Sequence, residues 1–331
     1  MKPYPEVENV YPLIRSMPGF PYLISANVYA IGKGPITLID TGPKFSDSIT
    51  ILKKQLGAIG FDWNDIERIL FTHAHVDHAG LAVKIMEAVG RPIECFIHAE
   101  DRWRILKGNQ QEQIWNEETE KFCIRMNMPP KEIVKARKRF VGLRRLFDPL
   151  DSVSILEDGD VFQGDGYCLE VIHTPGHTSG GCCFYEPDYQ ILFSGDSVIK
   201  HITPIPLVTM KPGASKKSTY RSLYAFRESM ERLRQRNVRY VFPGHGEYID
   251  DFNALVDQYF RHHRRRMEMI LSALVKGAMS IYELVRKIFP KIPGGNLFLA
   301  MVEIFAHIEM LISEKKVELT DPGPPELYHA R

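Results

Sequence analysis

The segment "THAHVDHAG", residues 72–80, constrains this chain more than any other feature, because it holds four metal-binding side chains within six positions. These side chains are His73, His75, Asp77 and His78. The preceding run "RILF" is typical of a β-strand, and residues two apart in an extended segment point to the same side. His73 and His75 can therefore bind one ion. Asp77 and His78 follow where the chain turns into a helix near Ala79, and they can face a second ion.

Three further β-like runs end in side chains of the same kind. "LEVIHTPGH" supplies His177, "ILFSGD" supplies Asp196 and "YVFPGH" supplies His245. Ligands gather beyond the carboxyl ends of strands in open α/β sheets, so we expect all these side chains to converge. Small residues beside them would allow the tight loops that this geometry needs, namely Gly80, Gly176, Gly195, Gly244 and Gly246.

The number and type of these side chains indicate which metals they bind. Seven nitrogen and oxygen ligands exceed the needs of one four-coordinate zinc and suit two ions that share a carboxylate. Imidazole and carboxylate groups favour zinc, iron, manganese or cobalt over ions that prefer thiolates. We therefore predict two divalent metal ions as cofactors, zinc first, with iron or manganese as the alternatives.

The 331 residues divide into two parts by their sequence pattern. Short β-like runs and helical segments alternate up to about residue 253, interrupted by a polar, helix-favouring insertion over about residues 100–148. Beyond residue 253, three helix-like segments and the short strand "KVELT" follow. We predict an α/β catalytic domain over residues 1–253 and a small, mostly helical C-terminal domain over residues 254–331.

Composition narrows the classes of partner and location. Lys and Arg number 42 against 41 Asp and Glu, so global charge gives no reason to expect a nucleic-acid or anionic-membrane binder. Five cysteines without a C-x-x-C spacing indicate a reducing compartment. The first residues lack the apolar core of a signal peptide, and no stretch reaches membrane-spanning length. We expect a cytoplasmic protein that does not bind membranes.

The motifs "LIDTG", "THAHVDHAG", "HTPGHTSGG", "FSGDS" and "PGHG" carry a family resemblance over roughly residues 20–250. Together they resemble the metallo-β-lactamase fold superfamily, in particular its glyoxalase II and ribonuclease Z-like hydrolases. The resemblance implies a four-layer αββα sandwich with a metal site at one edge. It also implies that Asp40 of "LIDTG" orients a ligand histidine. The C-terminal helices and strand resemble the winged-helix-like tail of some ribonuclease-like and acyl-hydrolase branches.

The same resemblance assigns the metal ligands. Metal 1 would be held by His73, His75 and His177, and metal 2 by Asp77, His78 and His245, with Asp196 bridging the two. True β-lactamases usually carry a cysteine at the position of Asp196, so hydrolysis of β-lactam antibiotics is not expected.

We expect a hydrolase in which a hydroxide that bridges the two metals attacks an ester-like bond, without a Ser or Cys nucleophile. Asp77 would act as a ligand first, and any proton shuttling by it would be secondary. A thiolate leaves without strong acid help, whereas a sugar alkoxide benefits from a positioned acid. The only candidate acid beside the motifs is His201, in the loop after Asp196. A thioester of acyl-CoA or glutathione type is therefore favoured, with a lactone or a phosphodiester, including RNA, as alternatives.

The insertion contains the basic segment "KEIVKARKRFVGLRR", with seven basic residues against one acidic. It predicts either an exposed helix face or a lid over the metals in which Lys135, Arg137 and Lys138 hold an anionic substrate. The third C-terminal helix is apolar and acidic, unlike a DNA-recognition helix, so we expect it to pack on the catalytic domain or a second subunit. The expected partner is a small, anionic molecule, while RNA and a homodimer stay open.

Two rival functions keep the fold. An iron oxidoreductase of flavodiiron type would have Glu in place of His75 and an attached flavin domain, and this chain has neither. A mononuclear persulfide dioxygenase would not need the complete second ligand set. A non-catalytic binding protein with this fold would be expected to lack some ligands, whereas this chain keeps all seven.

Overall fold

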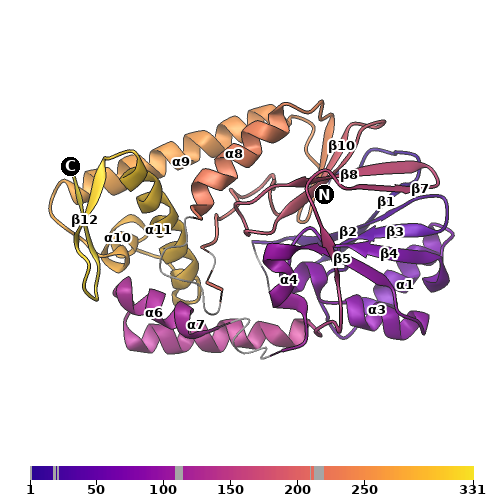
Figure 1. The fold of residues 1–331 in the computed structure, drawn as a ribbon, viewed down its shortest axis with the longest axis horizontal. Helices are drawn as coiled ribbons and strands as arrows, with labels where there is room; N and C mark the ends of the chain where they lie inside the picture. Colours follow the sequence, from indigo (N-terminus) through magenta and orange to yellow (C-terminus); the bar gives the residue numbers. More distant parts are fainter. Residues whose placement is uncertain (1, 18–19, 21, 109–114, 209, 212–219) are drawn as a thin grey trace.

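The computed structural model describes residues 2–17, 20, 22–108, 115–208, 210–211 and 220–331. In this part of the chain, two β-sheets pack face to face (Figure 1). The first sheet has six strands in chain order: β1 (Val10–Ser16), β2 (Ser25–Ile31), β3 (Ile36–Ile39), β4 (Ile66–Leu70), β5 (Glu94–His98) and β6 (Ser154–Leu156). Pairing is antiparallel from β1 to β3 and parallel from β3 to β6.

The second sheet has the strand order β11-β10-β9-β8-β7. Its strands are β7 (Val161–Gly164), β8 (Tyr167–His173), β9 (Cys182–Glu186), β10 (Ile191–Gly195) and β11 (Tyr240–Pro243). Only β10 and β11 pair in parallel. The alternating direction of side chains along a strand explains how this sheet contacts two layers. Ile191 and Phe193 of β10 face the first sheet, whereas Leu192 between them faces the covering helices.

Helices cover the outer face of each sheet. Helices α1 (Ser48–Ala58) and α3 (Ala82–Val89) pack on the first sheet, through residues such as Leu56 and Ile85. Helices α8 (Ser222–Arg234) and α9 (Phe252–Leu274) pack on the second, through residues such as Phe226 and Tyr259. The layers therefore run helix, sheet, sheet, helix, which confirms the predicted αββα fold.

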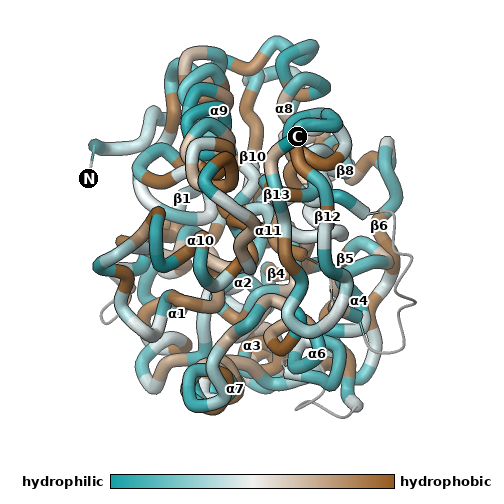
Figure 2. The backbone as a smooth tube through the Cα atoms, turned by 90° about the vertical axis from the view of Figure 1, so that its left-hand side faces the viewer, coloured by the Kyte–Doolittle hydropathy of each residue, from teal (hydrophilic) through white to brown (hydrophobic). Residues whose placement is uncertain are grey.

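The remaining elements lie mostly on one side of these layers, which faces the viewer in Figure 2. They are the 3-10 turns η1 (Trp63–Asp65), η2 (Arg144–Leu146) and η3 (Gly294–Asn296), the helices α2 (Val76–Ala79), α4 (Ala99–Ile105), α6 (Glu117–Arg125), α7 (Pro130–Leu143), α10 (Ile281–Ile288) and α11 (Leu297–Ser313), and the paired strands β12 (Val317–Asp321) and β13 (Leu327–Ala330). The insertion helices α6 and α7 share one hydrophobic cluster with the second half of α9, α10, α11 and both of these strands. The domain boundary at residue 253 stays a prediction.

The expectation that no stretch reaches membrane-spanning length is wrong for the region of α11. Residues 294–313 form a single helical stretch, because η3 continues into α11, and it is long and apolar enough to cross a membrane. Half of an apolar 18-residue window within this stretch is buried, and buried residues such as Met301 and Ile308 belong to the cluster shared with α6 and α7. The core helix of a globular protein has the same length and composition.

Two buried histidines join α9 to α11. His263 and His307 are each 1% exposed, and their rings lie 5.6 Å apart. Within the described residues, neither ring nitrogen of His263 has a hydrogen-bond partner, and neither has Nε2 of His307. Burial lowers the pKa of His263 to about 2 and that of His307 to about 4. Both side chains therefore stay neutral in the folded protein at pH 5, where unfolded histidines are protonated.

We expect the free energy of unfolding to fall as the pH falls from 7.5 to 5, because the unfolded chain then binds more protons than the folded chain. For His263 alone the loss is about 2 kcal/mol, given an unfolded pKa of about 6.5. Urea unfolding of the wild type and of His263→Met at both pH values measures this. The variant should lose about 2 kcal/mol less than the wild type. Equal losses in the two proteins would mean that His263 is not a buried neutral imidazole.

Candidate metal centre

The four chain segments that carry the predicted ligands all end at one edge of the sandwich. His73 and His75 follow β4 of the first sheet, and Asp77 and His78 lie on the short helix α2 that comes next. His177 follows β8, Asp196 directly follows β10, and His245 comes two residues after β11. The second sheet thus supplies three of the seven side chains, and packing of the two sheets brings both sets together.

The first group of donors is formed by His73, His75, His177 and Asp196, whose ligand atoms lie within 4.8 Å of one another. Nδ1 of His75 lies 2.9 Å from Nε2 of His73 and 3.2 Å from Nε2 of His177. Oδ2 of Asp196 lies 3.5 Å from Nε2 of His177. These separations leave the four donors around one point, as the ligands of a single ion are arranged.

The second group is formed by Asp77, His78 and His245, also with ligand atoms within 4.8 Å of one another. Nε2 of His78 and Nε2 of His245 lie 3.3 Å apart, and Oδ1 of Asp196 lies 3.3 Å from each of them. Asp196 therefore presents one carboxylate oxygen to each group. This arrangement suits two ions that share a carboxylate.

The hydrogen bonds of the outer ring nitrogens show which nitrogens face inward as acceptors. Nδ1 of His78 donates to Oδ2 of Asp40 at 2.8 Å, that of His245 to the Ser25 carbonyl at 2.5 Å, and that of His177 to the Ile205 carbonyl at 3.0 Å. In a neutral imidazole with Nδ1 protonated, Nε2 carries only a lone pair. The inward-facing nitrogens of these three histidines are therefore ready to bind metal.

These inward-facing lone pairs would repel one another without a cation between them. Two Nε2 atoms face each other at 3.3 Å, and the buried Oδ1 of Asp196 has no hydrogen-bond partner among the described residues. Buried polar atoms are nearly always partnered, so an orphaned carboxylate oxygen aimed at two imidazoles needs an explanation. Divalent cations fit this donor set of nitrogen and oxygen atoms.

Burial dominates the protonation of the first group. It lowers the pKa of His73, lowers that of His177, and lowers that of His75 to about 3, where neighbouring histidines add to the effect. All three side chains are therefore neutral at pH 7, which is the form that binds metal.

The carboxylates dominate the second group. Burial opposes protonation there, but Asp196 outweighs it, raises the pKa of His78 well above its usual value, and raises that of His245 to about 10. In turn, these two histidines overcome the effect of burial and hold the pKa of Asp196 well below its usual value. The second group therefore requires positive charge, which either protons or a metal ion can supply.

One side of the centre is open to solvent. The side chains of His73, His78 and His245 are at most 2% exposed, whereas those of His177 and Asp77 are 14% and 16% exposed. A substrate can therefore approach from the side of His177 and Asp77.

Comparison with known proteins agrees with this centre. Residues 21–245, more than half of the chain, match the family described as the metallo-β-lactamase superfamily. The chain belongs to the metallo-β-lactamase superfamily. The family predicted from the motifs is thus confirmed.

Three relatives of this superfamily member align along most of its length. The chain is 26% identical to "Probable metallo-hydrolase YqjP" of Bacillus subtilis, over 88% of each sequence. It is 25% identical to "Lactamase-like protein nscB" of Aspergillus fumigatus, over 96% of the chain and 82% of the relative. It is similar to the crystal structure of a metallo-β-lactamase family protein from Thermus thermophilus, with 26% identity, a TM-score of 0.79, and coverage of 98% of this chain and 99% of the other.

Asp40 lies behind the candidate metal centre and holds His78 and Thr72 in place. Its buried carboxylate accepts hydrogen bonds from His78 Nδ1, from the backbone N–H of Thr72 and from the Thr72 hydroxyl, each at 2.8 Å. With its hydroxyl proton given to Asp40, Thr72 can accept a hydrogen bond from Nδ1 of His73 at 3.1 Å. One carboxylate thus fixes a ligand in each group, the first through Thr72 and the second directly.

Asp101 is a supporting residue that no sequence motif indicated. It is 1% exposed on α4, and it accepts hydrogen bonds from the backbone N–H of Ala74 at 3.0 Å and of Gly180 at 3.2 Å. Ala74 lies between two ligands, and Gly180 closes the loop that carries His177. Asp101 therefore ties both loops of the first group to α4. The sequence does not indicate this role of Asp101, because its partners are backbone N–H groups, which nearly every residue type has.

We expect Asp101→Asn to weaken metal binding by about 10- to 100-fold, as is typical when an outer-shell partner of a metal site is lost. The amide presents a donor where the carboxylate had only acceptors, so one backbone N–H loses its partner. Competition with a chromophoric zinc chelator measures the affinity, and Glu100→Gln, an exposed change on the same helix, is the matched control. Equal affinities in both variants would show that Asp101 does not position these loops.

None of the candidate substrate residues belongs to either donor group. The exposed His201 donates from Nε2 to the Tyr22 carbonyl at 2.9 Å, beside the Gly246 backbone. On α7, the exposed Lys135 pairs with Glu132, and Arg137 pairs with Glu120. Lys138 is also exposed. Two of the three cations of the lid hypothesis, Lys135 and Arg137, thus have partners within the helical insertion, and the role of all three toward a substrate stays a prediction.

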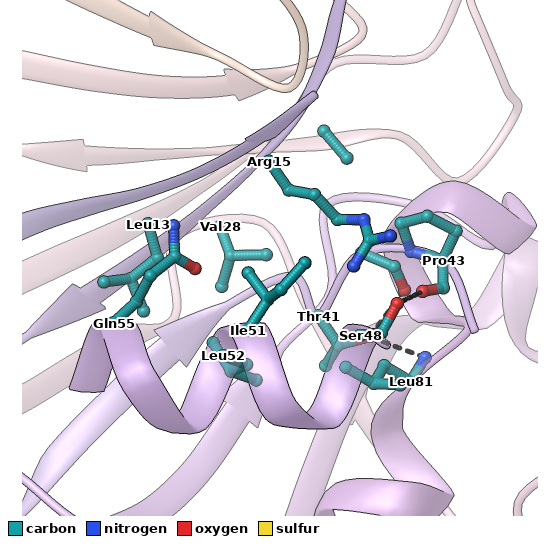
Figure 3. Close-up of a pocket in the computed structure, with 12 residues that line it drawn as sticks. Leu13, Arg15, Val28, Thr41, Pro43, Ser48, Ile51, Leu52, Gln55 and Leu81 are labelled. Atoms are coloured by element: carbon teal, nitrogen blue, oxygen red, sulfur yellow. Dashed lines mark hydrogen bonds between the residues drawn. The ribbon is translucent and has the colours of Figure 1, made fainter. Parts of the chain in front are cut away.

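A small pocket lies beside the loop that follows β3 (Figure 3). It is lined by residues that include Arg15, Thr41 and Ser48, and its volume is about 20 Å³. That volume holds roughly one water molecule and no substrate. The backbone N–H of Thr41 donates to the His78 carbonyl at 2.7 Å, so the pocket lies behind the second group and not on its open side.

Proposed function

We propose that the chain is a hydrolase that uses two divalent metal ions, zinc first, to cleave a thioester of acyl-CoA or glutathione type. The observation that carries this proposal is Asp196, whose two carboxylate oxygens face two separate groups of donors. When bound, such a pair of ions lowers the pKa of a water molecule and stabilises the oxyanion of the attacked carbonyl. The name of the Bacillus subtilis relative, a probable metallo-hydrolase, agrees with hydrolysis.

The chain's own residues hold and orient this site. Asp40 and Asp101 fix the ligand loops from behind, so the inward-facing atoms do not need to rearrange during the reaction. Asp77, with Oδ2 3.4 Å from Nε2 of His245, is the ligand carboxylate nearest to solvent. It serves as a ligand first, and its exposed edge lets it pass a proton to solvent.

The surroundings of the centre favour a leaving group that needs no acid. Among the described residues beside the ligand loops, His201 already donates Nε2–H to a carbonyl, and the Tyr220 hydroxyl reaches the Gly176 carbonyl at 3.4 Å. Burial raises the pKa of Tyr220, which makes its hydroxyl a weaker acid. A thiolate departs without such help, whereas an alkoxide does not.

A parallel hydrolysis assay tests this proposal. Protein loaded with zinc or manganese is given an acyl-CoA, a glutathione thioester, a lactone and a phosphodiester, with Asp196→Ala as the blank. Thiol release well above the blank supports the proposal. Cleavage of the phosphodiester alone would overturn the thioester assignment and favour a nuclease. Oxygen uptake with a glutathione persulfide would instead favour the dioxygenase.

We also propose a cytoplasmic location for the chain. All five cysteines are free thiols, and only Cys168 is even partly exposed. Thiols in this state agree with a reducing compartment.

A further inference from the structure

The side chain of Arg104 lies on helix α4, next to the metal centre. Asp101 on the same helix contacts Ala74 and Gly180, which places this helix directly against both loops of the first donor group. Arg104 comes three residues later, and residues three apart lie on the same side of a helix. Figure 1 shows α4 at the edge of the sandwich that faces α11. Arg104 therefore lies on the side of α4 that contacts these two loops.

The guanidinium of Arg104 has unused hydrogen-bond donors in the described part of the chain. Its guanidinium forms no ion pair and no hydrogen bond with the described residues. It stacks over the ring of Trp103, 4.5 Å from the ring centroid. Asp101 is the acid whose charge acts on Arg104. Its two carboxylate oxygens already accept hydrogen bonds from backbone N–H groups. Arg104 is only partly exposed, and burial lowers its pKa. A partly buried cation is costly when the only nearby acid named here already accepts other hydrogen bonds, unless a bound anion compensates.

Three other candidate cations differ from Arg104 in this respect. Lys135 and Arg137 pair with glutamates on the insertion helices. Arg102, on the same helix as Arg104, is exposed to solvent and therefore hydrated. Arg104 thus combines three properties: it borders the donor group that is open to solvent, it is partly desolvated, and its donors are unused among the described residues.

We propose that Arg104 is a substrate-binding residue that holds a carboxylate or phosphate group of the substrate beside the metal centre. The proposal rests on the proposed hydrolase function and narrows its substrates to anionic ones. The planar guanidinium presents paired N–H donors that match two oxygens of either group, and stacking on Trp103 keeps its plane fixed. The anionic group can belong to the acyl part or to the thiol part of a thioester.

Three thioesters distinguish these sources. S-acetyl-N-acetylcysteamine is neutral, S-succinyl-N-acetylcysteamine carries a carboxylate on the acyl part, and S-acetyl-phosphopantetheine carries a phosphate on the thiol part. The measured quantity is kcat/KM for each anionic substrate divided by kcat/KM for the neutral one. We expect Arg104→Met to lower this ratio by about 10- to 100-fold for one anionic substrate, which identifies the source. Arg104→Lys should keep part of the ratio, and Arg102→Met should leave it unchanged.

A ratio that is unchanged in Arg104→Met for both anionic substrates would overturn the proposal. If the wild type cleaves no thioester, the proposed function fails, and binding tests Arg104 separately. Calorimetry then compares the affinity of succinate and of inorganic phosphate for the zinc-loaded Arg104→Met and Arg102→Met proteins. An affinity at least about tenfold weaker in Arg104→Met supports the anion-binding role. Equal affinities in the two variants would overturn it.

Discussion

Replacing Asp196 with alanine is expected to remove metal and activity together. Its two oxygens face both donor groups, so no other side chain can take its place. We expect bound zinc to fall from two ions to at most one per chain, and hydrolysis to fall by more than about 10³-fold. This exceeds the roughly 10- to 100-fold effect of losing an outer-shell partner, because a ligand common to both ions is lost.

Metal content by mass spectrometry and hydrolysis by thiol release measure the two losses in parallel. The matched control is Asp188→Ala, an exposed aspartate in the turn after β9, which should keep both ions and full activity. Circular dichroism of both variants shows whether the fold is retained. A fully active Asp196→Ala protein without bound metal would refute the metal-dependent mechanism itself.

The predicted ligand side chains could be grouped from sequence because local rules place them. A strand followed by "THAHVDH" places ligands by side-chain direction alone, and the motif "LIDTG" marked Asp40 through its resemblance to a family. Both predictions depend on a few neighbouring residues. The αββα layers follow similarly from strands that are apolar on both faces. In β10, for example, successive apolar residues point alternately to the other sheet and to the covering helices.

The supporting contacts could not be found in this way, because they join distant backbone atoms. The carbonyls of Ser25 and Ile205 fix His245 and His177, yet any residue offers a carbonyl. The partners of Asp101 are backbone N–H groups for the same reason. The packing of α6 and α7 against the C-terminal helices could not be predicted from the sequence either, since it depends on contacts between residues more than 100 positions apart.

The hydrophobic cluster that contains α6, α7 and α11 also contacts the loop that holds His177 in place. No sequence motif indicated this loop. Ile205 accepts from His177 Nδ1, and the backbone N–H of Leu207 donates to the His177 carbonyl at 3.2 Å. Leu207, Val208 and Met210 pack against the cluster that includes α6, α7 and α11. A ligand histidine is thus held on one side by a loop whose other side lies in the second hydrophobic core. This loop therefore connects the candidate metal centre to the cluster that contains the C-terminal helices.

Gly244→Ala is expected to damage the centre by steric displacement alone. A Cβ atom at this position would lie 2.5 Å from Cε1 of His78 and 2.8 Å from Oδ1 of Asp196, both closer than real Cβ contacts. The backbone of Gly244 is not in the left-handed region, so alanine causes no strain of its own there. The new methyl group must therefore push two metal ligands outward. Displacements of about 1 Å cost on the order of 10²-fold in rate, which is the loss of activity we expect.

The absorption spectrum of the cobalt-loaded protein separates this effect from unfolding, because its ligand-field bands report the coordination of each ion. We expect Gly244→Ala to bind cobalt with altered bands and to lose mainly the ion held by His78 and His245. Gly142→Ala on α7, where an added Cβ meets no atom within 4 Å, is the control and should keep the wild-type spectrum. A Gly244→Ala protein with two ions, an unchanged spectrum and full activity would show that His78 and Asp196 do not approach this glycine. The shared-carboxylate geometry would then be wrong, because it depends on the placement of these two side chains.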